Sequence, residues 1–215
     1  NAADGIADER IRYLRYEKRL PMTENWNRCL ESVDSDFFCF IHDDDIWAPN
    51  FLTSSMRMFQ EDEALSVVLS SHTKFSSNEC SSHVIARGEV RQWTLLSHLV
   101  RADLLFAIAV QPLAHMSALL IRGPVMAFDA SLTWVADQAY LLAQARRGVL
   151  GINGATTVAI RMHTQSGTAS FSRAWASYET MGNCRRALTS LLKSKLLNSE
   201  LPSSYLDECS PGMLF

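Results

Sequence analysis

The feature that most constrains the fold is a short apolar run that ends in three consecutive carboxylates. Residues 36–41 are nearly all apolar, and Asp43, Asp44 and Asp45 follow directly after His42. A run of this kind indicates a strand that is buried on both faces, which is typical of parallel sheets. Three adjacent carboxylates repel one another and raise one another's pKa values, so we expect a cation to meet them at the strand end.

The acidic triplet is a candidate metal site. On extended backbone, side chains alternate between faces, so Asp43 and Asp45 would point one way and Asp44 the other. Two carboxylates on one side of a strand end can share a hard divalent ion, Mg²⁺ or Mn²⁺, with substrate phosphates. The alternative is a solvated acidic turn that also caps the next helix. The triplet alone leaves both interpretations open.

The pattern around the triplet predicts an α/β fold. Apolar residues recur with helical spacing in two segments and form short runs in three others, so strands and helices alternate. The first helix has Thr23 as its candidate cap. The expected elements are a strand at 8–16, a helix at 21–31, a strand at 36–41, a helix from Pro49 and a strand at 65–69.

The rest of the chain predicts a polar loop followed by further alternation. Gly148 lies where a glycine is expected to end a helix. The expected elements are a loop at 70–89, a helix at 93–106, a strand at 116–121, a helix at 135–147, strands at 149–152 and 156–160, and a long amphipathic helix at 172–197.

Composition limits the classes of protein. An apolar content of 47% with 20% charged residues is ordinary for a soluble globular protein, and the net charge of −3 gives no indication of nucleic-acid binding. No segment approaches the roughly 20 apolar residues of a membrane span. The five cysteines have no CxxC spacing, so neither a zinc cluster nor a disulfide framework is expected, and we expect a reducing, cytoplasmic location.

Four residues outside the triplet are candidates for chemistry. Asp137 could be a general base, or it could cap the start of its helix. Arg161 and His163 end a strand together and could contact a diphosphate or complete a metal shell, although a histidine at a strand end is often only a surface residue. Trp47 could stack on a sugar or base, or it could fill the core.

Four stretches in this order resemble the family 2 inverting glycosyltransferases, which bind nucleotide sugars in a GT-A fold. Asn25–Leu30 resembles the family's "N-x-N-x-x-L" helix, and Phe40–Leu52 resembles its acidic metal motif. Phe128–Leu141 resembles the "F-D-x-x-L…(E)D-x-x-L" acceptor segment, and Ile160–His163 resembles "Y-R-x-H". The resemblance runs from about residue 8 to about residue 170.

The resemblance implies a fold, an activity and residue roles. The fold would be a Rossmann-like mixed sheet flanked by helices, and the reaction would move a sugar from a nucleotide-sugar donor to a glycan or lipid-linked acceptor hydroxyl with inversion. Asp137 would be the catalytic base. The metal ligands would be Asp43, Asp45 and His163, and the donor diphosphate would be held by Asp43, Asp44, Arg161, His163 and Trp47.

Three departures from the family pattern keep alternatives open. Ala136 stands where a glutamate usually precedes Asp137, and His42 takes the first acidic position of the commoner metal motif. The opening nucleotide-binding strands of the family have no counterpart. We therefore expect an N-terminally truncated glycosyltransferase domain at 1–170 and a helical extension at 171–215. The alternatives are a truncated, non-catalytic binding module and a metal-dependent hydrolase.

The helix expected at 172–197 carries basic residues, which are compatible with two different surroundings. The helix could lie on the inner face of a membrane near a lipid-linked acceptor. Alternatively, it presents a solvated face and packs back on the domain.

Overall fold

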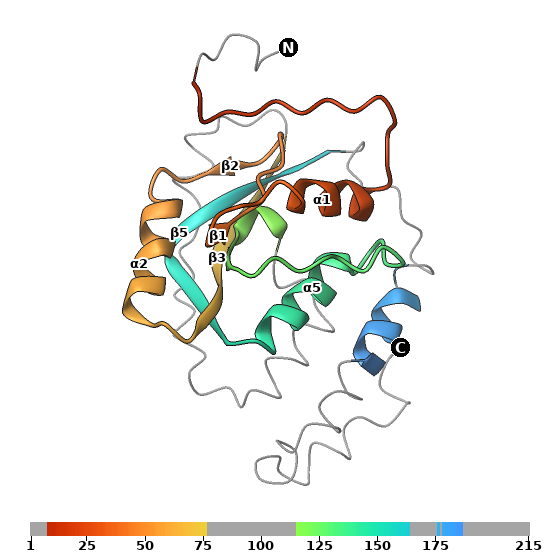
Figure 1. Cartoon of the computed structure of the whole chain (residues 1–215). Helices are drawn as coiled ribbons and strands as arrows, with labels where there is room; N and C mark the ends of the chain where they lie inside the picture. Colours follow the sequence, from red (N-terminus) through yellow and green to blue (C-terminus); the bar gives the residue numbers. More distant parts are fainter. Residues whose placement is uncertain (1–7, 77–114, 164–175, 177, 187–215) are drawn as a thin grey trace, which may run out of the picture.

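The computed structural model describes residues 8–76, 115–163, 176 and 178–186 (Figure 1). The order of elements is α1 (Met22–Leu30), β1 (Phe37–Phe38), β2 (Ile46–Trp47), α2 (Phe51–Glu61), β3 (Leu65–Ser76), η3 (Met116–Ala118), β4 (Leu119–Arg122), α5 (Ala136–Ala145) and β5 (Val149–Met162). Residues 176 and 178–186 are also helical.

The strands form one mixed sheet in the order β1-β4-β3-β5-β2. Only β3 and β5 run parallel, and the pairs β1–β4, β3–β4 and β2–β5 are antiparallel. The expected α/β class is therefore confirmed. The parallel strand expected at 36–41 is wrong, because only Phe37 and Phe38 pair, antiparallel to β4 at the sheet edge. Phe40 instead packs against the rings of Trp26 and Phe128, so its apolar character reflects side-chain packing outside the ladder.

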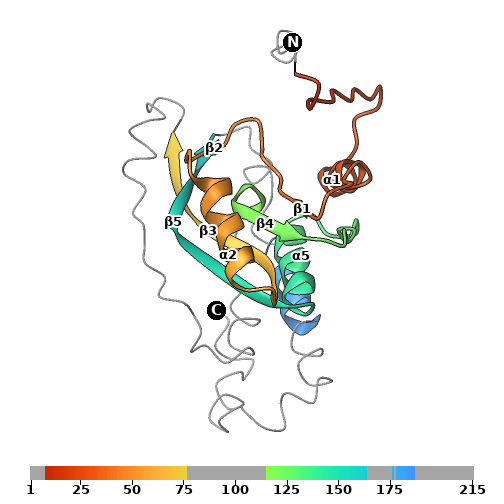
Figure 2. The same ribbon diagram turned by 60° about the vertical axis from the view of Figure 1, so that its left-hand side comes forward.

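The central strands are buried on both faces because helices cover both sides of the sheet (Figure 2). Val67 and Leu69 join one apolar cluster, while Val68 between them joins another. This alternation follows from the two-residue period of a strand. The first cluster includes Leu141 of α5, and the second includes Phe59 of α2.

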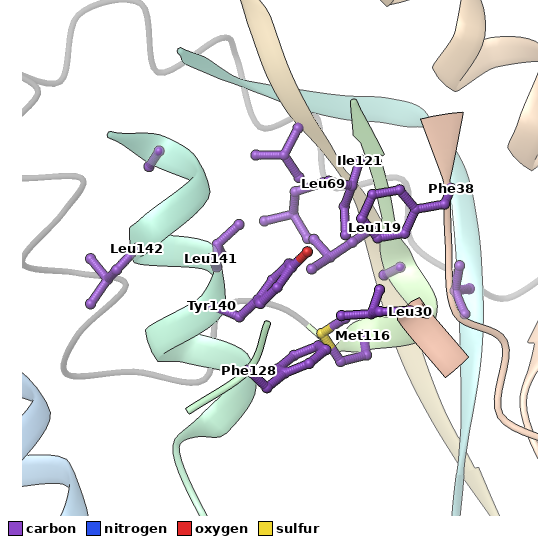
Figure 3. Packing of buried hydrophobic residues seen from close by; sticks show 14 of the residues in the cluster. Leu30, Phe38, Leu69, Met116, Leu119, Ile121, Phe128, Tyr140, Leu141 and Leu142 are labelled. Carbon is purple, nitrogen blue, oxygen red and sulfur yellow. The ribbon is translucent and has the colours of Figure 1, made fainter. Parts of the chain in front are cut away.

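The larger cluster is the main core of the domain (Figure 3). Aromatic stacking organises it: Phe128 lies 4.1 Å from Tyr140 and 5.0 Å from Trp26, measured between ring centroids. Leu119 and Ile121 of β4 complete it from the sheet. The core thus joins α1, the segment before α5 and the central strands, which are the elements that carry the candidate site.

The first part of the described chain differs from the expectation. Residues 8–16 form no strand; Tyr13 and Tyr16 are 55% and 51% exposed. No described strand of the sheet pairs with residues 8–16, so the alternation of charged and apolar residues there does not form a β-strand. Helix α1 begins after Pro21, and Thr23 is buried inside it instead of capping it.

Two further expectations are corrected around β3 and β5. Residues 70–76 continue β3 as a strand instead of starting a loop, and the strands expected at 149–152 and 156–160 are one strand, β5. Among the described residues no glycine has a positive φ, so Gly148 is no left-handed helix cap. A glycine is needed at 148 because the backbone of Ala64 approaches closely: a Cβ at 148 would lie 2.6 Å from the carbonyl oxygen of Ala64.

Some expected elements lie outside the described residues. These are the helix at 93–106, residues 77–89 of the loop, and parts of the helix at 172–197. In the described part of the chain, no helix combines the length and the apolar character needed to cross a bilayer.

Candidate functional site

The pairing of β2 with β5 brings the acidic triplet to the end of β5. Ile46 is opposite Ala159, and Trp47 is opposite Val158. Because the strands are antiparallel, the residues just before Ile46 lie beside those just after Ala159. Asp44 and Asp45 are therefore held next to Arg161, although more than a hundred residues separate them in sequence.

The triplet is a turn and not extended backbone. Asp43 and Asp44 are turn residues, and the Asp45 N–H donates to the His42 carbonyl oxygen at 3.2 Å. The alternation expected for Asp43 and Asp45 is therefore wrong, because the chain reverses there. Asp43 is exposed. His42, Asp44 and Asp45 each offer one ligand atom, and these three atoms lie within 4.8 Å of one another.

Asp45 is the most constrained carboxylate of the turn, with a side chain only 3% exposed. Its Oδ2 accepts from Ser117 Oγ at 2.6 Å and lies 3.4 Å from His42 Nδ1, and its Oδ1 accepts from the Arg161 N–H at 3.1 Å. Burial acts to raise the pKa of Asp45, but these hydrogen bonds outweigh it and the pKa lies below its ordinary value. Asp45 is therefore held as a buried, charged carboxylate.

Asp44 contacts both residues expected at the end of β5. His163 Nε2 lies 2.9 Å from Asp44 Oδ2. Arg161 Nε donates to the Asp44 carbonyl oxygen at 3.1 Å, and the guanidinium lies 4.7 Å from the centroid of the Phe75 ring. The structure thus brings Arg161 and His163 to the triplet. Their roles in holding a diphosphate or a metal stay predictions.

His42 is held in place by Trp26 of α1. The two rings stack with centroids 5.9 Å apart and planes 11° apart. The pKa of His42 is raised, chiefly by its contact with Asp45, while burial opposes the rise. Its Nε2 is buried and has no hydrogen-bond partner among the described residues. A buried, unpartnered imidazole nitrogen is an available ligand atom.

Asp137 lies in the first turn of α5 and is half-buried. Burial raises the pKa of Asp137 to about 6, although the Gln138 N–H donates to Oδ1 at 2.8 Å and the charge of His42 acts to lower the pKa. The action of the His42 charge indicates that the Asp137 carboxyl group lies within electrostatic range of the turn. A carboxyl group with this pKa can take up a proton near neutral pH.

The local alternative for Asp137 was helix capping. Val135 is the N-cap residue, and it makes no side-chain cap hydrogen bond. Asp137 itself accepts from the adjacent Gln138 N–H. Asp137 thus bonds an N–H group of the first turn, as the capping alternative expects, while the carboxylate of Glu179 accepts from the N–H groups just before the helix, at Thr133, Trp134 and Val135.

Trp47 packs as part of the scaffold. Its ring stacks on Phe51 with centroids 4.5 Å apart, and its Nε1 donates to the Ser117 carbonyl oxygen at 2.8 Å. These contacts support the alternative for Trp47, in which the indole fills the core and does not stack on a sugar. The donor-binding role of Trp47 stays a prediction.

Sequence reasoning missed two residues that organise the site. Ser117 bonds both the His42 N–H and the Asp45 carboxylate. Asn27 donates to the Phe128 carbonyl oxygen at 3.0 Å and accepts from the Phe128 N–H at 2.7 Å, which ties α1 to the segment before α5. A buried serine in the apolar run at 116–121 was the available signal for the first. The second belongs to the N-x-N-x-x-L motif at 25–30, but its contacts with Phe128 need the tertiary structure.

Comparison with known proteins gives a family and a fold. The family model described as glycosyl transferase family 2 matches residues 1–118. The structure of S. aureus TarS 1–349 in complex with UDP aligns with a TM-score of 0.54 at 12% identity, over 87% of this chain and 48% of that one. The complex of the same protein with UDP-GlcNAc aligns with a TM-score of 0.52 at 14% identity, over 87% of this chain and 50% of that one. The chain thus spans about half the length of these structures. No curated protein sequence matches it.

Proposed function

The chain belongs to glycosyl transferase family 2, and on that premise we propose that it forms the site of an enzyme that moves a sugar from a nucleoside-diphosphate donor to an acceptor hydroxyl. The observation that carries the proposal is that two groups lie within electrostatic range of each other. The turn at His42–Asp45 supplies clustered ligand atoms, and Asp137 supplies a carboxyl group with a pKa of about 6 in the same electrostatic environment.

The turn fits a divalent cation by the chemistry of its donors. Two carboxylates and an imidazole suit Mn²⁺, and carboxylates with phosphate oxygens suit Mg²⁺. The unpartnered Nε2 of His42 and the 4.8 Å cluster support this set: His42, Asp44 and Asp45. His163, bonded to Asp44, and the exposed Asp43 are further candidates from the sequence. A bound cation would neutralise charge on the donor diphosphate.

Asp137 has the properties of the base. Its carboxylate would accept the proton of the acceptor O–H, and the acceptor oxygen would form a bond to the anomeric carbon of the sugar. The bond between that carbon and the phosphate oxygen breaks, and its electron pair leaves with the nucleoside diphosphate. A single displacement of this kind inverts the anomeric centre. The raised pKa makes Asp137 a stronger base than an ordinary aspartate, which favours proton transfer.

Arg161 and His163 would help the leaving group. The guanidinium of Arg161 lies against Phe75 and is held by the Asp44 carbonyl oxygen. Such a held cation can bind phosphate oxygens in a fixed orientation. The donor nucleotide is proposed as UDP, since the two similar structures were solved with UDP and UDP-GlcNAc.

The test is the release of UDP from UDP-GlcNAc and other UDP-sugars, with and without a panel of glycan and lipid-linked acceptors. We expect acceptor-stimulated release that requires Mn²⁺ or Mg²⁺. Asp137→Asn should reduce kcat by about 10²–10⁴-fold, whereas Asp34→Asn, which changes an exposed carboxylate at the other end of the apolar run, should not. Binding of UDP without turnover of any donor would contradict the proposal and favour a non-catalytic binding module.

A further inference from the structure

A buried glutamate reaches the start of α5 from the helical segment 178–186. Glu179 is 5% exposed. One of its carboxylate oxygens accepts from the Trp134 N–H at 2.6 Å and from the Val135 N–H at 3.2 Å, and the Thr133 N–H lies 3.1 Å from both oxygens. The Thr133 hydroxyl also donates to Glu179, at 2.6 Å.

These bonds hold the backbone that leads into α5. The first N–H groups of a helix have no partner within the helix. Val135, the N-cap of α5, makes no side-chain cap hydrogen bond. Glu179, 44 residues further along the chain, accepts from the N–H of Val135 and from those of the two residues before it, and its negative charge lies near the positive end of the helix.

The carboxylate of Glu179 stays ionised in this position. Burial acts to raise the pKa of Glu179, but the hydrogen bonds from Thr133, Trp134 and Val135 outweigh burial, so the pKa lies below its ordinary value. The bonds are therefore charge-assisted, and such bonds are about twice as strong as neutral ones. A group held by them tolerates little displacement.

We propose that Glu179 is a positioning residue, which fixes the first turn of α5 and thereby sets the place of Asp137. This rests on the proposed function, in which Asp137 is the base. Asp137 is only two residues beyond Val135, so a change in the backbone at Thr133–Val135 moves its carboxylate directly. A displacement of about 1 Å at a reacting group can cost about 10²-fold in rate.

The rest of the segment docks independently of Glu179. Cys184 packs against the main core, and Asn183 is buried. Arg186 lies 3.8 Å from Asp129 in an ion pair whose side chains are about half exposed. Replacement of Glu179 should therefore loosen the start of α5 without releasing the whole segment. Arg186→Ala is a matched control, since it removes a contact between the segment and the part of the chain before α5 but leaves the backbone N–H groups bonded.

The experiment compares Glu179→Ala, Glu179→Gln and Arg186→Ala in the intact protein. We expect amide hydrogen exchange at Thr133–Val135 to be faster in Glu179→Ala. The same variant should lose about 10–100-fold in kcat with the donor KM unchanged. Glu179→Gln keeps one acceptor oxygen and should restore part of both losses. Arg186→Ala should change neither quantity.

Each contrary result has a distinct meaning. Unchanged exchange at Thr133–Val135 in Glu179→Ala would show that Glu179 does not hold this backbone. Faster exchange with an unchanged kcat, or an equal loss of kcat in Arg186→Ala, would overturn the positioning role and leave Glu179 a structural contact. If the wild-type protein transfers no sugar, the proposed function fails, but the exchange measurement still decides whether Glu179 holds the start of α5.

Discussion

Asp137→Asn should stabilise the protein while it slows transfer. Burial raises the pKa of Asp137 to about 6 from an ordinary value of 3.8. Keeping the carboxylate charged in the folded state therefore costs about 3 kcal/mol at pH 7. The amide of the variant is neutral, has nearly the same shape and can still accept from the Gln138 N–H, so most of this cost should be recovered.

The pH dependence of this gain follows from proton linkage. Below about pH 4 Asp137 is protonated in both the folded and the unfolded state, so the substitution should change little. As the pH rises from 4 to 6, the unfolded chain loses this proton before the folded one, and the wild type loses stability at up to about 1.4 kcal/mol per pH unit. Above pH 6 the advantage of the variant should be constant.

The assay is urea unfolding of both proteins at several pH values between 4.5 and 7.5, without added metal. Asp129→Asn is the control, because its effect on stability should have the opposite sign. The pKa of Asp129 is lowered, chiefly by its hydrogen bond from Ser131, so its replacement should reduce stability at neutral pH. A variant Asp137→Asn that is less stable than the wild type at pH 7, or a gain that does not vary with pH, would refute the reasoning.

Two further predictions concern the base and the sheet. If Asp137 is the base, kcat/KM should rise with pH through about 6 and fall to about a tenth of its plateau at pH 5; a profile that is flat from pH 5 to 7 contradicts this role. Gly148→Ala should destabilise the fold by about 1–3 kcal/mol in urea unfolding, because its Cβ would meet the Ala64 carbonyl oxygen. In contrast, Gly182→Ala should raise the free energy of unfolding by about 0.5–1 kcal/mol, because position 182 is helical and a Cβ there meets nothing within 4 Å.

The fold class could be predicted because apolar runs and helical periodicity are local properties. The helices α1 and α5 lie where the pattern placed them, and so does the first part of β3, at 65–69. The direction of the strands could not be predicted, because an apolar run can arise from burial within a sheet or from side-chain packing outside it. Val68 is buried between the sheet and its helices, whereas Phe40 is half-buried against Trp26 and Phe128, outside the strand pairing. The sequence pattern of the two is alike.

The candidate site could be predicted as a set of residues but not as a geometry. Arg161 and His163 reach the triplet as expected, because β2 pairs with the end of β5. The turn at Asp43 and Asp44 changed which side chains converge, and it groups His42, which the sequence left open as a ligand or a polar residue at the strand end, with Asp44 and Asp45. Glu179 could not be predicted at all, since its bonds to Thr133–Val135 depend on how the helical segment 178–186 docks.

Isothermal titration of the protein with UDP, in the presence and absence of Mn²⁺, tests the central claim most directly. The account predicts binding that depends on the metal and weakens strongly in Asp45→Asn, while Asp34→Asn binds like the wild type. The absence of any UDP binding with Mn²⁺ present, or binding of equal strength with the metal removed, would contradict the claim that the turn at His42–Asp45 holds the donor diphosphate through a cation.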